Sequence, residues 1–151
     1  MKCLSISQPF ADLVISGKKS IELRSWNTNF RGEFLVHAPL KIRFEDSKRL
    51  KINKKFVTGA IIGKAQIYNV KRYDSIKEIR AERKFHLASR KPQKKTYGFM
   101  LKNAKPFRIP IPWKGQLGLF DVDIPKLKIK DKEIVYDIID EECRYQWIGH
   151  H

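Results

Sequence analysis

The feature that most constrains the fold is a long strand-like region, Val57–Tyr73, with glycines inside it. The region is rich in Ile, Val and Tyr, which favour strands. Gly59 and Gly63 interrupt it. Glycines within a strand-like run favour bulges or bends. A long strand bent in this way is typical of a small β-barrel.

Shorter candidate elements surround this region. Further strands are expected at Lys2–Ile6, Ser20–Trp26, Glu33–Ala38 and Thr96–Asn103. Helices are expected from Pro9 to Gly17, over 41–52 and over Ser75–Phe85. A chain of 151 residues has room for one domain with a sizeable core. We therefore predict a single α+β domain over residues 1–151, a small and partly closed β-barrel flanked by two or three helices.

Two other segments look irregular. Phe107–Trp113 contains Pro110 and Pro112 and follows Pro106, so it is predicted to be extended but poorly suited to a central strand. Residues 86–95 are predicted to form an exposed basic loop.

The segment from Gly17 to Trp26 carries the most unusual chemistry. Alternation along a strand places Ile21 and Leu23 on an apolar face, which we expect to be core. The opposite face holds Ser20, Glu22, Arg24 and Trp26. A carboxylate, a guanidinium and an indole in a row suit a planar, charged ligand such as a nucleotide. The alternative is a solvated ion pair beside a tryptophan that plugs the core.

The charge of the chain points to a polyanionic partner. It has 32 Lys and Arg against 16 Asp and Glu, a net charge of +16. Residues 41–55 carry a net charge of +5 and residues 71–105 a net charge of +9. An excess of this size on a small domain favours nucleic-acid binding over a merely soluble basic surface.

The composition also bears on metals and location. The two cysteines, Cys3 and Cys143, are not spaced as a CxxC pair and cannot by themselves make a zinc site. No apolar run is long enough to span a membrane, and the N-terminus has no secretory pattern. We therefore expect a cytoplasmic monomer with no resident metal or cofactor and no membrane partner.

Several segments, in order along the chain, resemble the ASCH family of the PUA-like superfamily. The clearest is Gly17-x-Lys19-x-x-Glu22-x-Arg24-x-Trp26, which resembles the family pattern G-x-K-x-x-E-x-R-x-W. The other similar segments are Ser5–Ala11, Arg31-Gly32 with Val36–Ala38, Tyr97–Phe99, and Gly115–Phe120. Together they span about residues 4 to 123, which leaves residues 126–151 as a C-terminal extension of unassigned role.

The resemblance implies a PUA-like β-barrel with a basic cleft between the barrel and the first helix. Lys19, Glu22, Arg24 and Trp26 would line that cleft. RNA or another single-stranded nucleic acid would be the partner. The predicted nucleic-acid contacts also include Arg31, His37, Lys94, Lys95 and Tyr97.

Catalysis is the alternative that the sequence leaves open. Some relatives resemble ribonucleases, and Lys19, Glu22 and Arg24 would then serve as charge stabiliser, base and transition-state clamp, with a divalent metal assisting. Other relatives resemble amidohydrolases of acetylcytidine that use a Lys, a Thr and a Glu. Lys19 matches their lysine, but Glu22 stands where the threonine would be. His37 and His86 are acid–base candidates, although each is more typical of an ordinary strand or loop histidine.

The charge predicts a strong salt dependence of nucleic-acid binding. Each phosphate neutralised on a single strand contributes a slope of about −0.7 in log K against log salt. With roughly four to six contacts, the slope measured by fluorescence anisotropy on labelled RNA should lie near −3 to −4. A slope near zero would contradict the nucleic-acid prediction.

Overall fold

Six strands form a single mixed sheet in the order β2–β5–β4–β3–β1–β6 in a computed structural model, which describes residues 1–89 and 95–123. The strands are β1 (Lys2–Ser5), β2 (Ile21–Arg24), β3 (Gly32–Ala38), β4 (Ala60–Tyr73), β5 (Thr96–Pro112) and β6 (Leu119–Asp121). The helices are α1 (Phe10–Ile15), α2 (Phe44–Arg49), α3 (Ile76–Ala81) and α4 (Arg83–His86). The predicted α+β class is confirmed. Lys94, Cys143 and the extension over 126–151 lie outside the described residues.

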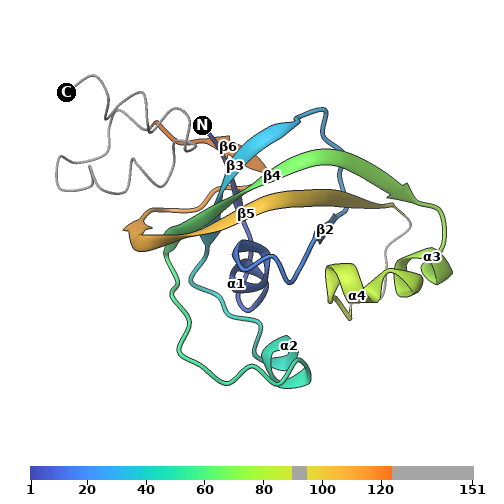
Figure 1. The fold of residues 1–151 in the computed structure, drawn as a ribbon, viewed down its shortest axis with the longest axis horizontal. Coiled ribbons are helices and arrows are strands. Elements are labelled where there is room, and N and C mark those ends of the chain that lie inside the picture. The colour runs from blue at the N-terminus through green and yellow to red at the C-terminus, as the bar shows by residue number, and fades with distance from the viewer. Residues whose placement is uncertain (90–94, 124–151) are drawn as a thin grey trace.

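β4 and β5 are the two longest strands of the sheet; they pair antiparallel and are strongly curved (Figure 1). Their register shifts between Ile61 and Gly63, between Lys64 and Gln66, and between Ile67 and Asn69. Such bulges bend a strand and increase its twist. Gly63 therefore lies at a bend, as the sequence predicts, whereas Gly59 lies just before β4.

The sheet is open among the residues that the structure describes. Its two end strands are β2 and β6, and no pairing joins them. β1 pairs with β3 in parallel, and the other neighbouring strands are antiparallel. Partial closure into a barrel therefore stays a prediction.

Apolar side chains pack on both faces of the sheet. On one face α1 contributes Phe10, Ala11, Leu13, Val14 and Ile15, which pack against β3, β4 and β5. The apolar positions of α1 thus cover the middle of the sheet (Figure 1). A second cluster contains Cys3, Leu35, Ile61, Phe107, Ile111, Phe120 and Val122.

The prediction that Phe107–Trp113 is extended but poorly suited to a central strand is confirmed, because β5 continues as a strand to Pro112 and its second half lies at an edge of the sheet. β2 pairs only with residues Tyr97 to Met100 of β5, so within residues 1–89 and 95–123 the second half of β5 has β4 as its one strand neighbour. An N–H on the free edge needs no strand partner there, and proline is tolerated at such positions. The helix expected over 41–52 is shorter and covers Phe44–Arg49. No helix among the described residues is long and apolar enough to cross a membrane.

The bend at Gly63 predicts a measurable cost for a single methyl group. A Cβ at this position would lie 2.5 Å from the Lys105 carbonyl oxygen and 2.6 Å from Cγ2 of Ile15. One contact is backbone and the other belongs to the core helix, so neither yields easily. Gly63→Ala should lower the free energy of unfolding by about 1–3 kcal/mol, measured by urea denaturation. A loss below about 0.5 kcal/mol, the range of neutral surface changes, would show that β4 can move away from β5 and α1 at Gly63.

Candidate functional site

One cavity of about 540 Å³ opens beside β2. Its walls include residues of α1, α2 and α3, together with residues 88–89 and 95–96. Its lining consists of Ser5, Ile6, Ser7, Phe10, Lys19, Glu22, Leu23, Arg24, Ser25, Trp26, Arg43, Asp46, Ile79, Ala88, Ser89, Lys95 and Thr96. The volume falls in the range of small-molecule sites. All four residues of the Gly17–Trp26 segment that the sequence assigned to a cleft are in this lining.

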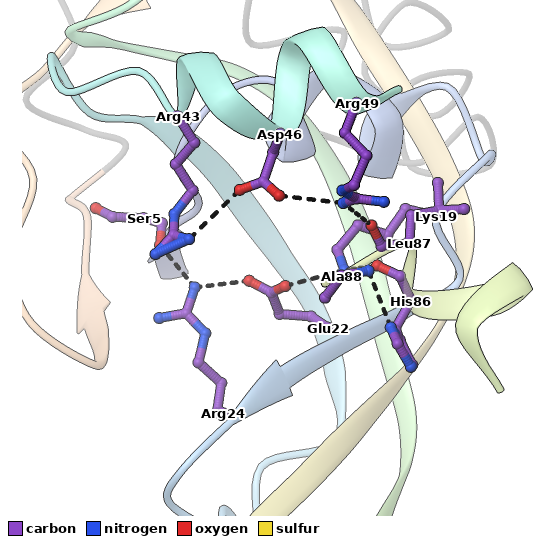
Figure 2. A network of polar contacts seen from close by, with 10 residues as sticks. All are labelled: Ser5, Lys19, Glu22, Arg24, Arg43, Asp46, Arg49, His86, Leu87 and Ala88. Carbon is purple, nitrogen blue, oxygen red and sulfur yellow. Dashed lines mark hydrogen bonds and ion pairs between the residues drawn. The ribbon is translucent and has the colours of Figure 1, made fainter. Parts of the chain in front are cut away.

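The innermost charges form a connected group around Glu22 (Figure 2). Lys19 Nζ lies 3.4 Å from Glu22 Oε1 and donates a hydrogen bond to the His86 carbonyl oxygen. Arg24 Nη2 donates to Glu22 Oε2 at 2.8 Å and to the Ser5 carbonyl oxygen at 2.8 Å. Through these two cations, Glu22 thus links the residues after α1, the end of β1 and the end of α4.

Burial distinguishes the members of this group. Lys19 is 2 % exposed and Glu22 is 7 % exposed, so both are core residues despite their charge. The Arg24 side chain is 22 % exposed and borders the cavity. Arg24 is therefore the most accessible cation of the three, while Lys19 is enclosed.

Burial and charge act in opposite directions on the two titrating groups. Burial alone would raise the pKa of Glu22, but Arg24 and Lys19 together hold the pKa of Glu22 below its usual value. Burial lowers the pKa of the Lys19 amine, and Glu22 only partly offsets this shift. We infer that Glu22 is ionised at neutral pH and is a weak base there.

A second charged group comes from α2, and the sequence analysis did not find it. Asp46 Oδ2 lies 3.5 Å from Arg43 Nη1, and Asp46 Oδ1 lies 3.1 Å from Arg49 Nη2. Arg43 and Asp46 line the cavity, whereas Arg49 does not. The only sequence signal is the spacing of an acid three residues from each of two arginines, which is common on solvated helices.

Residues 86–89 form the wall between the two charged groups. Lys19 donates to the carbonyl of His86, and Arg49 Nη2 donates to the carbonyl of Leu87 at 2.6 Å. Ser89 Oγ donates to Asp46 Oδ1 at 3.2 Å. One cation from each group therefore holds the wall in place.

Both candidate acid–base histidines have their ring nitrogens occupied. His86 Nε2 donates to the Ile79 carbonyl at 2.7 Å, and Nδ1 accepts from the Ala88 N–H at 3.0 Å. His37 Nε2 donates to the Trp113 carbonyl at 2.7 Å, and Nδ1 accepts from Ser5 Oγ at 2.9 Å. Burial lowers the pKa of both imidazoles. Each ring is thus neutral and bound as a structural residue, and neither lines the cavity.

Trp26 packs on the core and also borders the cavity. Its ring meets Phe99 edge-on, with centroids 5.2 Å apart and planes at 76°. It packs against the larger core cluster, is half-buried, and also lines the cavity. Ile21 is buried, as expected, but Leu23 is only half-buried and lines the cavity, so the expectation that Leu23 is a core residue was wrong.

The remaining predicted contacts are scattered. Lys95 is exposed and lines the cavity. Arg31 donates to the carbonyls of Thr28 and Phe30 and does not reach the cavity lining. Tyr97 packs against the core cluster and is also absent from the lining. His37 is buried elsewhere, and Lys94 is outside the described residues.

No metal centre is formed within residues 1–89 and 95–123, where no three His, Cys, Asp or Glu side chains gather. The Cys3 thiol is buried, and burial raises its pKa to about 12. It behaves as a small hydrophobic residue of the second core cluster.

Comparison with known families identifies the chain. A model of the ASCH domain matches residues 4–118, most of the sequence. The chain belongs to the ASCH domain family. The resemblance seen in the Gly17–Trp26 segment is thereby confirmed as family membership.

Solved ASCH structures share this fold. The crystal structure of ASCH from Zymomonas mobilis superposes with a TM-score of 0.63 at 16% sequence identity, covering 89% of this chain and 92% of that chain. Two single-substitution variants of that ASCH protein give TM-scores of 0.62 at 15% identity and 0.59 at 16% identity. They cover 92% and 82% of this chain, and 96% and 90% of their own. A comparison with curated proteins gives no significant match.

The buried ion pair predicts a pH-dependent loss of stability in Glu22→Gln. The amide leaves the enclosed Lys19 without an anion, and breaking a buried pair costs about 3–5 kcal/mol. Because the folded-state pKa of Glu22 lies below its unfolded value, its contribution is present above about pH 4.3 and is lost as pH falls through the folded-state pKa. Urea denaturation should therefore show the largest difference from wild type at neutral pH and a smaller one in acid.

Asp121→Asn is the control for this experiment. Asp121 pairs with Lys2 at 3.2 Å, but its side chain is 77% exposed. An exposed pair contributes about 0–1 kcal/mol. Equal losses in the two variants would mean that burial of Glu22 has no energetic consequence.

Proposed function

We propose that this ASCH domain binds RNA or single-stranded nucleic acid and that the cavity beside β2 takes one unpaired nucleotide. The observation that carries the proposal is that Trp26 and Arg24 line one cavity of about 540 Å³. An indole offers a stacking surface to any base, and a guanidinium pairs with phosphate or a base edge. Lys95, exposed at the same lining, adds a further cation.

The positive charge on the two long strands, β4 and β5, supports a polyanionic ligand. β4 and β5 contain no Asp or Glu, but they carry Lys64, Lys71, Arg72, Lys102, Lys105 and Arg108. Several of these side chains have local partners, such as Lys64 with Glu33 and Lys71 with Glu82. The two strands nevertheless carry more basic residues than these partners neutralise, and such an excess would attract a phosphate backbone over distances of a Debye length.

Within this proposal Lys19 and Glu22 are positioning residues. Glu22 accepts from Arg24 and so fixes the guanidinium at the cavity, while Lys19 holds the wall at His86. We propose that binding needs no cofactor, is carried out by a monomer, and takes place in the cytoplasm. Arg31, His37 and Tyr97 stay outside the nucleotide position.

Ribonuclease activity stays the alternative, and acetylcytidine amidohydrolysis the less favoured one. The lowered pKa of Glu22 makes it a weak base, which argues for a structural carboxylate over a general base. Labelled single-stranded RNA incubated with and without Mg²⁺ distinguishes these functions. Intact RNA that is retained by the protein supports binding, whereas metal-dependent fragments would favour the nuclease.

The proposal predicts that Trp26 contributes to affinity through stacking. Base–aromatic stacking contributes about 1–3 kcal/mol, so Trp26→Leu should weaken single-stranded RNA binding by about tenfold or more. Trp26→Phe keeps a ring against Phe99 and should retain most of the affinity. Anisotropy titrations with a labelled oligonucleotide measure both, after thermal melting confirms that each variant is folded.

Trp113→Leu is the matched control. Trp113 is also half-buried, but it packs against the second core cluster and is not in the cavity lining. It should bind RNA as wild type does. Equal losses at Trp26 and Trp113, or no loss at either, would remove the cavity from the proposal.

A further inference from the structure

Two arginines from separate elements come to the same side of the cavity. Arg24 ends β2, and Arg43 stands just before α2. Both are tied to the chain between the end of β1 and the start of α1, since Arg24 Nη2 donates to the Ser5 carbonyl and the Arg43 backbone N–H donates to the Gln8 carbonyl at 2.8 Å. Figure 2 places both guanidinium groups on the Ser5 side of the two carboxylates.

Both guanidinium groups keep unused donors. The two hydrogens of Arg24 Nη2 go to Ser5 and Glu22, which leaves Nε and Nη1 without a partner among the described residues. Arg43 meets Asp46 through Nη1 alone, at 3.5 Å, so its Nε and Nη2 are likewise without a described partner. The Arg24 and Arg43 side chains are 22% and 32% exposed, so these donors are accessible from the cavity.

The neighbouring carboxylates do not neutralise this pair. Glu22 is shared between Arg24 and Lys19, and Asp46 is shared between Arg43 and Arg49. With Lys95, the lining holds four cationic side chains against two anionic ones. The cavity is therefore electropositive where the unused N–H groups lie.

We propose that Arg24 and Arg43 together bind one phosphate group of the nucleotide. A planar carboxylate is satisfied by a single guanidinium fork, whereas the several outer oxygens of a phosphate accept from two forks. The identity of the ligand as a nucleotide rests on the proposed function, but the anion position itself rests on the two arginines. Since Trp26 lines the same cavity, one nucleotide presents its base to Trp26 and its phosphate to the arginine pair.

Arg43→Gln and Arg49→Gln form a matched pair of variants. Both arginines contact Asp46, their side chains are 32% and 33% exposed, and they lie six positions apart. Only Arg43 lines the cavity, because Arg49 donates to the Leu87 carbonyl in the wall. A direct contact with phosphate is lost only in Arg43→Gln, whereas a disturbance of α2 is produced by both.

The experiment compares a nucleoside with its 5′-monophosphate and with inorganic phosphate, using NMR titration of the arginine Nε–Hε signals. In wild type, the monophosphate should bind about tenfold or more tightly than the nucleoside, as expected for hydrogen bonds to a charged group. Inorganic phosphate should change the chemical shift of the Arg24 Nε–Hε signal. Arg43→Gln should reduce this ratio severalfold, because only Arg24 then contacts the phosphate, and Arg49→Gln should keep it.

Each outcome bears on the inference separately from the proposed function. Equal binding of nucleoside and monophosphate, with no response to inorganic phosphate, overturns the arginine pair even if RNA still binds. Equal loss of the ratio in Arg43→Gln and Arg49→Gln also overturns it, because the effect then comes from α2. A phosphate response without any RNA binding keeps the anion position and rejects the proposed function.

Discussion

The structure around the cavity depends on the ionised Glu22 carboxylate, which is buried between Lys19 and Arg24. Removing these charges from water is costly, and the cost is offset only while all three are paired and hydrogen-bonded. Because Lys19 also holds His86 and Arg24 also holds Ser5, the same requirement joins three distant parts of the chain. The position of the cavity wall at His86 and that of the Arg24 guanidinium are therefore coupled through Glu22.

The site repeats one arrangement in two places. In each case a carboxylate is shared by two cations, of which one fixes the 86–89 wall and the other faces the cavity. Lys19 and Arg49 have the structural role, and Arg24 and Arg43 have the exposed one. This division explains how a cavity can be basic while its carboxylates are all paired. It also separates the proposed ligand contacts from the residues on which stability depends.

Family membership and a shared fold do not by themselves establish a function. The ASCH structures from Zymomonas mobilis share the fold at 15–16% identity. A common fold hosts different activities, so function has to be argued from the site. The proposal of nucleotide recognition over acid–base chemistry rests here on the lowered pKa of Glu22, on the occupied ring nitrogens of His37 and His86, and on the position of Trp26 at the cavity.

Local patterns in the sequence were sufficient for the α+β class, for the bend at Gly63 and for the family segment from Gly17 to Trp26. These features depend on backbone preferences and on alternation along one strand, which neighbouring residues determine. The tertiary structure alone decided that Lys19 is enclosed and that Arg43 joins Arg24 at the cavity. It also gave the ring nitrogens of His37 and His86 hydrogen-bond partners, and it placed Arg31 and Tyr97 outside the cavity lining. Burial and choice of partner depend on residues far apart in the chain, so no local pattern encodes them.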